Sequence, residues 1–464
     1  MIAREIKLSR IQNNSSRFDG EYYLNESSYL SMKVEDYASF VPLSQVADVF
    51  NPSIFKRQFC LRSITATYYF QSSDVPCVFE KGCVYISKEQ SQRLNLLVGE
   101  GDILVTGFGS IGNTRYVNRC QQGVCYANNV CRIRPHKAVP KGFIYAFMTS
   151  KYGVAQLNKN ASGSVVRYIE APGIKKTIIP NLPDEVQLKS DKLIQDSARL
   201  REEAADELEL AEKLLKEKAG LRELTPDDYD YFGQHSATRK PICFTRRISK
   251  ISSRSINAFN YSERLERLKN LIPANMPLRN FLMGNTTFST GSFPRIEVKE
   301  GKGVMLINQS DAFDTIIKGK WISTRNVNLN NLVDYGEVII AGVGTLGENE
   351  TFCRALFANE DLKGQLISGE FIRMKTIENI PSGFLYAWLN SDYGFRLIRG
   401  TQAGTKLCRP IPEAFLDIPV PILSKEDMNE IDQMVREAHT KRHIANKKEL
   451  EAIAMVEAEI EKWN

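Results

Sequence analysis

The pattern of apolar and polar positions divides the chain into two kinds of segment. A longer run with apolar residues near 3.6-residue spacing predicts a helix over Gly142–Asn158. Short runs of β-branched or apolar residues, bounded by Gly, Pro, Asn or Asp, predict strands at Val75–Phe79, Cys83–Ser87, Ile103–Thr106 and Val130–Ile133. The first part of the chain is therefore expected to be a mixed α and β body.

Two other stretches have the pattern of long amphipathic helices. Residues 184–219 contain no Gly or Pro, are rich in Glu, Lys, Leu and Ala, and end at Gly220. Such a helix would be a rod of roughly 54 Å, at 1.5 Å per residue. A second stretch of this kind, residues 425–462, follows Pro419-Val420-Pro421. Helices of this length are expected to pair, and their apolar positions include Leu193, Leu208, Leu215, Ile431, Val435 and Ile453.

The chain carries one duplication of a whole unit. The stretch Gly101–Gly112, with its acidic residue, apolar run and three glycines, returns as Gly336–Gly347 at an offset of 235 residues. After these glycine ladders the offset becomes 241, where Pro140–Ala146 matches Pro381–Ala387. The predicted organisation is a first globular domain (1–183), a long helix (184–220), a connector (221–253), a second globular domain (254–424) and a second long helix (425–464).

The predicted fold class is α+β. It has two pseudo-symmetric mixed α/β domains separated by two long helices that form an antiparallel coiled coil. We expect such a pair to bury both apolar stripes and to hold the globular domains apart at its two ends.

The glycine ladder fits the letters G-x-G-x-x-G, which raises the alternative of a dinucleotide site. That site needs a helix directly after the glycines and an acidic residue about 20 positions further on. Here Gly112 runs into Asn113-Thr114-Arg115-Tyr116-Val117, which has the pattern of a turn and another strand. The glycines are therefore expected to serve sharp turns and close backbone approach, and no cofactor is predicted for this chain.

The remaining candidate chemistry does not assemble into a catalytic set. His439 and His443 are four residues apart on the last helix, but Lys441 and Arg442 between them favour a solvated helix face over a metal site. Neither a nucleophile–base pair nor a carboxylate dyad stands out by spacing. The first domain concentrates cysteines without CxxC spacing, and buried reduced thiols are favoured over a zinc site for Cys77, Cys83, Cys120, Cys125 and Cys131.

The charge distribution indicates a class of binding partner, and the composition indicates a cellular compartment. Residues 1–183 carry 22 Lys and Arg against 13 Asp and Glu, whereas the net charge of the whole chain is only +6. A basic first domain is compatible with a polyanion partner, although many basic domains only have a solvated basic face. The chain has neither an apolar run long enough to span a membrane nor a signal-peptide pattern at its N-terminus. We therefore expect a cytoplasmic protein.

Several further motifs accompany the duplication. They are Gly101–Val105 with Gly109–Gly112, Asn128–Ile133, Phe143–Tyr145 with Ser150–Gly153, and Gly163–Val166. With these motifs the chain resembles the specificity subunit of Type I restriction–modification systems over nearly its whole length. The second copy departs from the pattern, because Ser368-Gly369-Glu370-Phe371 replaces the Asn-Asn-Val that begins at Asn128.

The resemblance implies a non-catalytic subunit that binds double-stranded DNA. Each globular domain would be a target recognition domain that reads one half of a split sequence through the major groove. The paired helices, with the six apolar positions named above, would act as a spacer and dock two methyltransferase subunits. Those partners would bind S-adenosylmethionine, and restriction subunits would be optional further members.

DNA chemistry then selects candidate contacts, because Arg and Lys read guanine and hold phosphate. Twelve basic residues in variable loops are the candidates: Lys56, Arg57, Arg62, Arg115, Arg119, Arg167, Arg295, Lys302, Lys318, Lys320, Arg325 and Lys406. Two alternatives remain open at this point. One is a similar adaptor of a methylation-only or other phage-defence complex, and the other is a coiled-coil scaffold that does not bind DNA.

Overall fold

The computed structural model describes most of the chain. The described residues are 5–13, 18, 20–37, 39–60, 63–78, 84–136, 139–163, 167–225, 228, 243–251, 255–347 and 350–463. Several residues named above lie outside these ranges: Arg62, Cys83, Phe79 at the end of a predicted strand, and residues 164–166.

Each half of the chain folds into a unit with two small sheets, which we call the inner and the outer sheet. In the first unit (residues 1–183), the inner sheet has the order β2 (Ala47–Phe50), β9 (Val130–Pro135), β6 (Ile103–Thr106) and β7 (Thr114–Tyr116). Its outer sheet has the order β3 (Phe59–Cys60), β5 (Tyr85–Ser87), β4 (Ala66–Phe70) and β8 (Cys125–Tyr126). The predicted strands at Ile103–Thr106 and Val130–Ile133 are confirmed.

The second unit (residues 254–424) repeats this design. Its inner sheet has the order β15 (Ala355–Phe357), β14 (Val338–Ala341) and β17 (Phe371–Met374), and its outer sheet β13 (Lys320–Ile322), β12 (Val304–Ile307) and β16 (Leu366–Ile367). Three two-stranded ribbons complete the β structure: β1 (Phe40–Pro42) with β10 (Ile178–Pro180), β11 (Asn275–Pro277) with β20 (Pro419–Pro421), and β18 (Gln402–Ala403) with β19 (Arg409–Pro410).

Strand register shows that the duplication extends to backbone pairing. Leu104 of β6 lies opposite Arg132 of β9, and Ile339 of β14 lies opposite Arg373 of β17, at the offsets of 235 and 241 found in the sequence. Each outer sheet contains one parallel pair, β4 with β8 and β12 with β16, beside an antiparallel neighbour. The two units therefore share the pairing of three strands in each sheet, whereas β2 and β3 lack a counterpart among the described strands of the second unit.

The helix predicted over Gly142–Asn158 is two helices, α6 (Lys141–Thr149) and α7 (Lys151–Lys159). The break falls at Ser150, whose extended backbone (φ −62°, ψ 159°) lets its Oγ accept a hydrogen bond from Gly153 N at 3.3 Å. A Cβ on Gly153 would lie 2.2 Å from the carbonyl oxygen of Phe147, so the sharp corner requires glycine. The second unit has the same corner between α12 (Ser382–Asn390) and α13 (Asp392–Arg399). The short helices are α1 (Leu8–Asn13), α2 (Gly20–Leu24), α3 (Glu26–Glu35), α4 (Leu43–Val46), α5 (Lys88–Arg93), α8 (Ala171–Ile174), α11 (Glu263–Asn270) and α14 (Pro412–Leu416).

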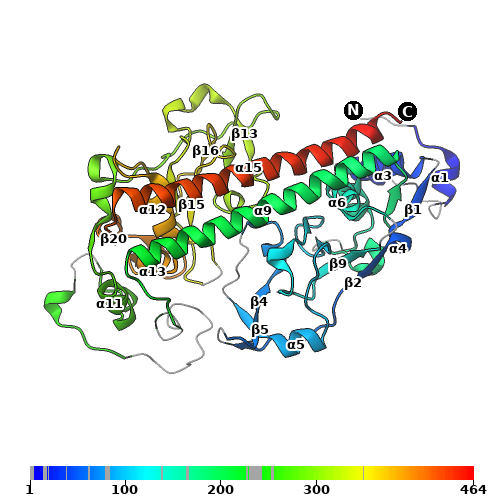
Figure 1. The fold of residues 1–464 in the computed structure, drawn as a ribbon. Coiled ribbons are helices and arrows are strands. Elements are labelled where there is room, and N and C mark those ends of the chain that lie inside the picture. Colours follow the sequence, from blue (N-terminus) through cyan, green and yellow to red (C-terminus); the bar gives the residue numbers. More distant parts are fainter. Residues whose placement is uncertain are drawn as a thin grey trace.

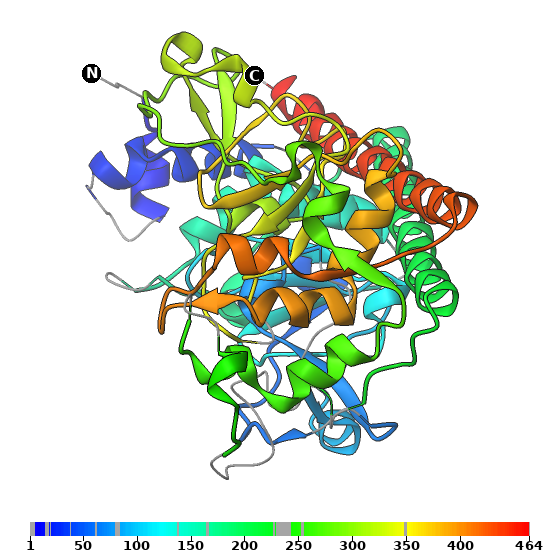
Figure 2. The ribbon, with the colours of Figure 1, turned by 90° about the vertical axis from the view of Figure 1, so that its left-hand side faces the viewer.

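The two long helices, α9 (Asp184–Lys218) and α15 (Lys425–Glu461), pack against each other in antiparallel orientation, as predicted (Figure 1). Lys218 at the end of α9 pairs with Asp427 at the start of α15 at 2.8 Å, and Lys448 near the other end pairs with Asp196 at 3.2 Å. Figure 2 shows both helices along one flank of the molecule, with the strands of both units on the other side.

Each unit docks on a long helix through the same hydrogen bond. Gly142 N at the start of α6 donates to Asp191 Oδ1 of α9 at 2.7 Å, and Gly383 N at the start of α12 donates to Asp432 Oδ1 of α15 at 2.6 Å. Gly142 and Gly383, like Asp191 and Asp432, are 241 residues apart. The two halves are thus related by a pseudo-twofold axis across the helix pair.

The units are not held fully apart, contrary to expectation. Val78 N of the first unit donates to the Phe313 oxygen of the second at 2.8 Å, and Thr315 N donates to the Pro76 oxygen at 2.7 Å. The predicted strand at Val75–Phe79 is wrong, because the described residues there form a turn after a 3₁₀ helix at Ser72–Asp74. Its partner is a loop more than 230 residues away, which no local pattern reveals.

His439 is buried, which corrects the expected solvated face. Its ring lies 5.0 Å from the ring of Phe357 and 5.2 Å from that of Tyr386, between α15 and the core of the second unit. Burial, with a smaller contribution from the Arg442 charge, holds the pKa of His439 well below its usual value of 6.5. His443, by contrast, places Nδ1 2.5 Å from Asp361 Oδ1.

We expect His439 to make the fold acid-sensitive. Because its pKa is lowered in the folded state, the unfolded chain takes up the proton first as pH falls below about 6.5. The contribution of the neutral ring to the free energy of unfolding is therefore fully present above that pH. Below it, this contribution decreases by up to about 1.4 kcal/mol per pH unit. Urea unfolding at several pH values should show a shallower acid loss for His439→Leu than for the parent chain. Equal slopes would contradict the assignment.

Disulfide bonds, metal-binding clusters and membrane-spanning helices are absent from the described residues. The described cysteines are free thiols, namely Cys60, Cys77, Cys120, Cys125, Cys131, Cys243, Cys353 and Cys408. Within the same ranges, no cluster of three or more His, Cys, Asp or Glu side chains is arranged to hold a metal ion. Nor does that part of the chain contain a helix with the length and apolar character needed to cross a membrane.

Candidate nucleic-acid interface

The two glycine ladders are hairpin turns of the inner sheets. β6 pairs antiparallel with β7 across the first ladder, and β14 pairs with β15 across the second, so that each ladder is followed by a strand. A Cβ on Gly107 would lie 2.4 Å from the Ile169 oxygen, and one on Gly342 would lie 2.5 Å from the Glu370 oxygen. The structural interpretation of the ladders is confirmed, since both copies need glycine for close backbone approach.

An exposed aromatic pair lies at the first ladder. The ring of Phe108 stacks on the ring of Tyr168 with centroids 5.6 Å apart, and both side chains remain partly exposed. The corresponding positions of the second unit are Val343 and Arg409. Sequence reasoning missed this pair, although an aromatic residue between two turn glycines is a usable signal for an exposed ring. Exposed rings beside cations are suited to contact nucleic-acid bases.

A buried arginine lies on the equivalent strand of each inner sheet, Arg132 on β9 and Arg373 on β17. Arg132 is fully buried and donates to the backbone oxygens of Leu96, Tyr126, Ala127 and Val130, and burial lowers its pKa to about 10. Its counterpart Arg373 instead forms two 2.8 Å bonds with Glu337. In the first unit the equivalent acid, Asp102, pairs with the half-exposed Arg134. Arg132 and Arg373 hold the sheets together and are buried, so they are inaccessible to DNA.

Most of the twelve candidate basic residues are exposed. Arg57 lies 5.7 Å from the centre of the Tyr69 ring, Arg295 lies 5.9 Å from that of Phe293, and Lys320 pairs with Glu297. The exposed candidates are Lys56, Arg57, Arg119, Arg167, Arg295, Lys302, Lys318, Lys320, Arg325 and Lys406. Arg62 lies outside the described residues.

At least three of the candidates have structural partners: Arg115, Arg119, and Arg167, which donates to the Asn158 oxygen of its own unit. The expected exposure of Arg115 is wrong, because its guanidinium is buried and donates to the backbone oxygens of Val75 and Cys77. Arg119 is exposed, but it donates to Asp206 at 2.6 Å and thereby ties the first unit to α9. Position in a loop does not distinguish such residues from DNA contacts.

Several of the other candidates lie on or beside the outer sheets. Lys56 and Arg57 precede β3, and Lys320 begins β13. Figure 1 places β13 at the top of the view and β4 and β5 at the bottom, with the helix pair between them in this view. Each unit therefore presents its own exposed basic side chains, which we call its basic surface.

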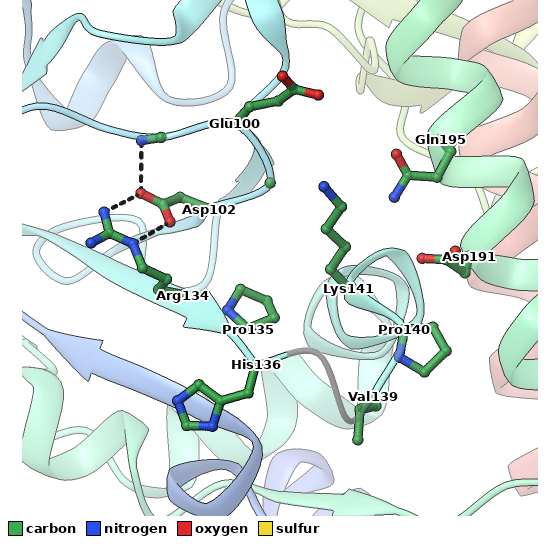
Figure 3. Close-up of a pocket in the computed structure, with 12 residues that line it drawn as sticks. Glu100, Asp102, Arg134, Pro135, His136, Val139, Pro140, Lys141, Asp191 and Gln195 are labelled. Atoms are coloured by element: carbon green, nitrogen blue, oxygen red, sulfur yellow. Dashed lines mark hydrogen bonds and ion pairs between the residues drawn. The ribbon is translucent and has the colours of Figure 1, made fainter.

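A pocket of about 470 Å³ lies between the first inner sheet and α9 (Figure 3). The Lys141 side chain points into it from the start of α6, with Gln195 of α9 beyond. Most of its other charges are already paired: Arg134 with Asp102, and Asp191 with the Gly142 amide. No nucleophile and base are brought together here, and the lining residues have no arrangement suited to catalysis.

The second unit fills the equivalent place with its own side chains. Arg436 stands where Gln195 stands in the first unit, and its guanidinium lies 5.4 Å from the centre of the Tyr335 ring. It also donates to Asp432 at 2.6 Å and to Ser382 at 3.1 Å. The pocket is thus a place where the two copies have diverged in packing.

The helix residues expected to dock partners are largely occupied within the chain. Leu215, Ile431 and Val435 are fully buried in the core of the second unit, and Leu193 and Leu208 pack against the cores of the first and second units. Ile453 is half-buried. They hold the helix pair and the units together, so a partner cannot use the buried ones. Large apolar side chains that remain exposed on the helices are Leu188, Leu210, Ile444 and Leu450.

The chain is similar to solved structures of one family over nearly its whole length. The S subunit of a Type I restriction–modification system from M. genitalium shares 13% identity (TM-score 0.35), with 92% of this chain and 95% of that one covered. The HsdS subunit of Thermoanaerobacter tengcongensis shares 14% (TM-score 0.26; 91% and 95% covered). A chain from a structure on complex assembly and conformational transition of the type I R-M system shares 15% (TM-score 0.26; 91% and 96% covered). No family model and no curated protein matches the sequence.

Proposed function

We propose that this chain is a non-catalytic DNA-recognition subunit that reads a bipartite target, one half-site per unit. The observation that carries the proposal is the pairing of two like units across an antiparallel helix pair, each with its own exposed basic surface. Two readers related by a pseudo-twofold axis suit two half-sites separated by base pairs that neither reader contacts. The exposed Arg and Lys side chains supply phosphate and guanine contacts.

The helix pair would connect the readers to the modifying enzyme. We propose that two methyltransferase subunits, each with bound S-adenosylmethionine, dock on the outward faces of α9 and α15, where Leu188, Leu210, Ile444 and Leu450 stay exposed. Restriction subunits would be optional further members. The complex would act in the cytoplasm, where its DNA target and the methyl donor occur.

Methylation mapping tests this proposal directly. DNA from cells that express the full-length chain with a methyltransferase encoded beside it would be compared with DNA from cells lacking only this chain. The expected result is a split sequence motif whose modification depends on this chain. Modification that lacks a split motif, or that is independent of the chain, would contradict the proposal. A non-DNA scaffold would give neither a motif nor co-purification with a methyltransferase.

Individual basic residues should contribute salt-sensitive affinity. Arg57→Ala and Lys320→Ala are each expected to weaken DNA binding by the assembled complex and to lower the slope of log K against log salt by about 1 per lost phosphate contact. Arg119→Ala is the matched control, because its guanidinium binds two carboxylates of the helix α9, Asp206 and Glu202, whereas Lys320 pairs with Glu297 beside its own outer sheet. Unchanged salt slopes for both Arg57→Ala and Lys320→Ala would remove the outer sheets from the interface.

A further inference from the structure

Two loops, one from each unit, meet in a short antiparallel β-bridge. The loop between β4 and β5 contributes Pro76–Val78, and the loop between β12 and β13 contributes Phe313–Thr315. Val78 N donates to the Phe313 oxygen at 2.8 Å and Thr315 N to the Pro76 oxygen at 2.7 Å. Cys77 and Asp314 face each other between these bonds, with Sγ 3.9 Å from Oδ1. Such a pair has its Cα atoms about 4.5 Å apart.

The bridge pairs equivalent residues of the two units. In the outer sheets, Tyr69 of β4 and Leu306 of β12 occupy the same register position, at an offset of 237 residues. The same offset relates Cys77 to Asp314, so each of these residues faces its own counterpart. The same offset converts one hydrogen bond into the other, because Val78 corresponds to Thr315 and Pro76 corresponds to Phe313. The contact is therefore isologous and lies on the pseudo-twofold axis.

Each bridging loop is anchored to the glycine-ladder hairpin of its own unit. Arg115 of β7 donates to the Cys77 oxygen and, at 3.1 Å, to the Val75 oxygen. In the second unit, Gln309 accepts from Val343 N at 3.2 Å and donates to the Val343 oxygen. A movement of one unit relative to the other would therefore have to break the bridge or distort an inner sheet.

We propose that this bridge determines specificity by fixing the separation and relative rotation of the two recognition units. It would thereby set the number of unread base pairs between the half-sites, and it rests on the function proposed above. The helix pair joins the units along one flank (Figure 2), and the bridge is a second tie, between a loop of each outer sheet. One added base pair rotates a half-site by about 35° around the duplex, so two readers at fixed rotation accept one spacing.

The size of the effect follows from the size of the contact. Two backbone hydrogen bonds correspond to a preference of about tenfold for the spacing that leaves them intact. Other spacings would be bound only with the bridge open.

The test uses the full-length chain in the assembled complex and duplexes in which the two mapped half-sites are separated by different numbers of base pairs. Asp314→Cys places a thiol opposite Cys77, and copper–phenanthroline with oxygen as the electron acceptor converts the pair to a disulfide. We expect the disulfide to form and the oxidised chain to keep the spacing of the parent. The double variant Cys77→Ser/Asp314→Cys, which cannot form it, is the control for oxidation elsewhere.

Variants that break the bridge test the opposite case, in which the preference for one spacing should weaken. Thr315→Pro removes the N–H that bonds to Pro76, and Cys77→Asp sets two carboxylates opposite each other without proline. We expect both to retain the half-site sequences and to lose about tenfold of the preference over spacings one base pair shorter or longer. Absence of the disulfide, a shifted spacing in the oxidised chain, or a parental preference in folded Cys77→Asp would overturn the inference. If the parent itself selected no split site, the proposed function would fail instead.

Discussion

Arg373→Met is expected to lower the free energy of unfolding of the second unit by about 3–5 kcal/mol. The change leaves the Glu337 carboxylate buried without its bidentate partner. Arg373 also donates to the Asn331 oxygen at 2.6 Å and to the Leu332 oxygen at 3.0 Å, and these acceptors would lose their donor as well. Lys375 approaches Glu337 only to 3.8 Å and does not replace the lost geometry. Urea unfolding followed by the fluorescence of Trp388, buried in this unit, measures the effect.

The double variant Glu337→Gln/Arg373→Met separates the charge from the packing. Most of the loss in the single variant is the cost of an unpaired buried carboxylate, so removing that charge should restore part of the stability. A double variant no more stable than Arg373→Met would mean that the backbone acceptors and the packing dominate. A loss well below about 1 kcal/mol in the single variant would contradict the buried pair itself.

The duplication made much of this fold predictable. Both ladders, the two long helices and their antiparallel pairing follow from patterns in which each copy supports the other. The end of α9 is an example: Gly220 has a positive φ of 64°, which glycine adopts without strain, so the residue at that position ends the helix. Local causes of this kind are present in the sequence itself.

Features that depend on distant partners were not predictable. Val75–Phe79 has the composition of a strand, but a capping box between Gln71 and Asp74 forms a 3₁₀ turn directly before it. The Val78 N–H and the Pro76 oxygen then bond to the backbone of the second unit. Arg115 has the same local pattern as an exposed loop arginine, yet two backbone oxygens in a neighbouring loop bind it. His439 is buried because α15 turns that face toward the second unit.

The candidate interface shows the same limit. Basic loop residues could be named from the sequence, but their sorting into exposed and structural side chains required the fold. Arg132 and Arg373 occupy the same position of the duplication and have different partners, since the longer Glu337 bonds Arg373 whereas Asp102 bonds Arg134. Two differences accompany the change of ion pair: Glu337 is one methylene longer than Asp102, and Lys375 stands at the position of Arg134.

Arg201→Leu is expected to destabilise the junction of the two units by about 3–5 kcal/mol. Arg201 of α9 donates to Glu449 and Asn446 of α15, Glu449 also accepts from Tyr145 of the first unit at 2.7 Å, and Asn446 donates to Asp361 of the second unit at 2.8 Å. One guanidinium thus joins both helices and, through them, both units.

Because Glu449 is buried, removing Arg201 leaves its charge with the Tyr145 hydroxyl as its one remaining hydrogen-bond partner among the described residues. Arg199→Leu is the matched control: it lies two positions away on α9, is exposed, and pairs with Glu203 and Asp196, so its loss should stay within about 1 kcal/mol. Adding Glu449→Gln to Arg201→Leu should recover part of the stability. Equal effects of the two arginine variants in urea unfolding would show that the network adds no more than a surface ion pair.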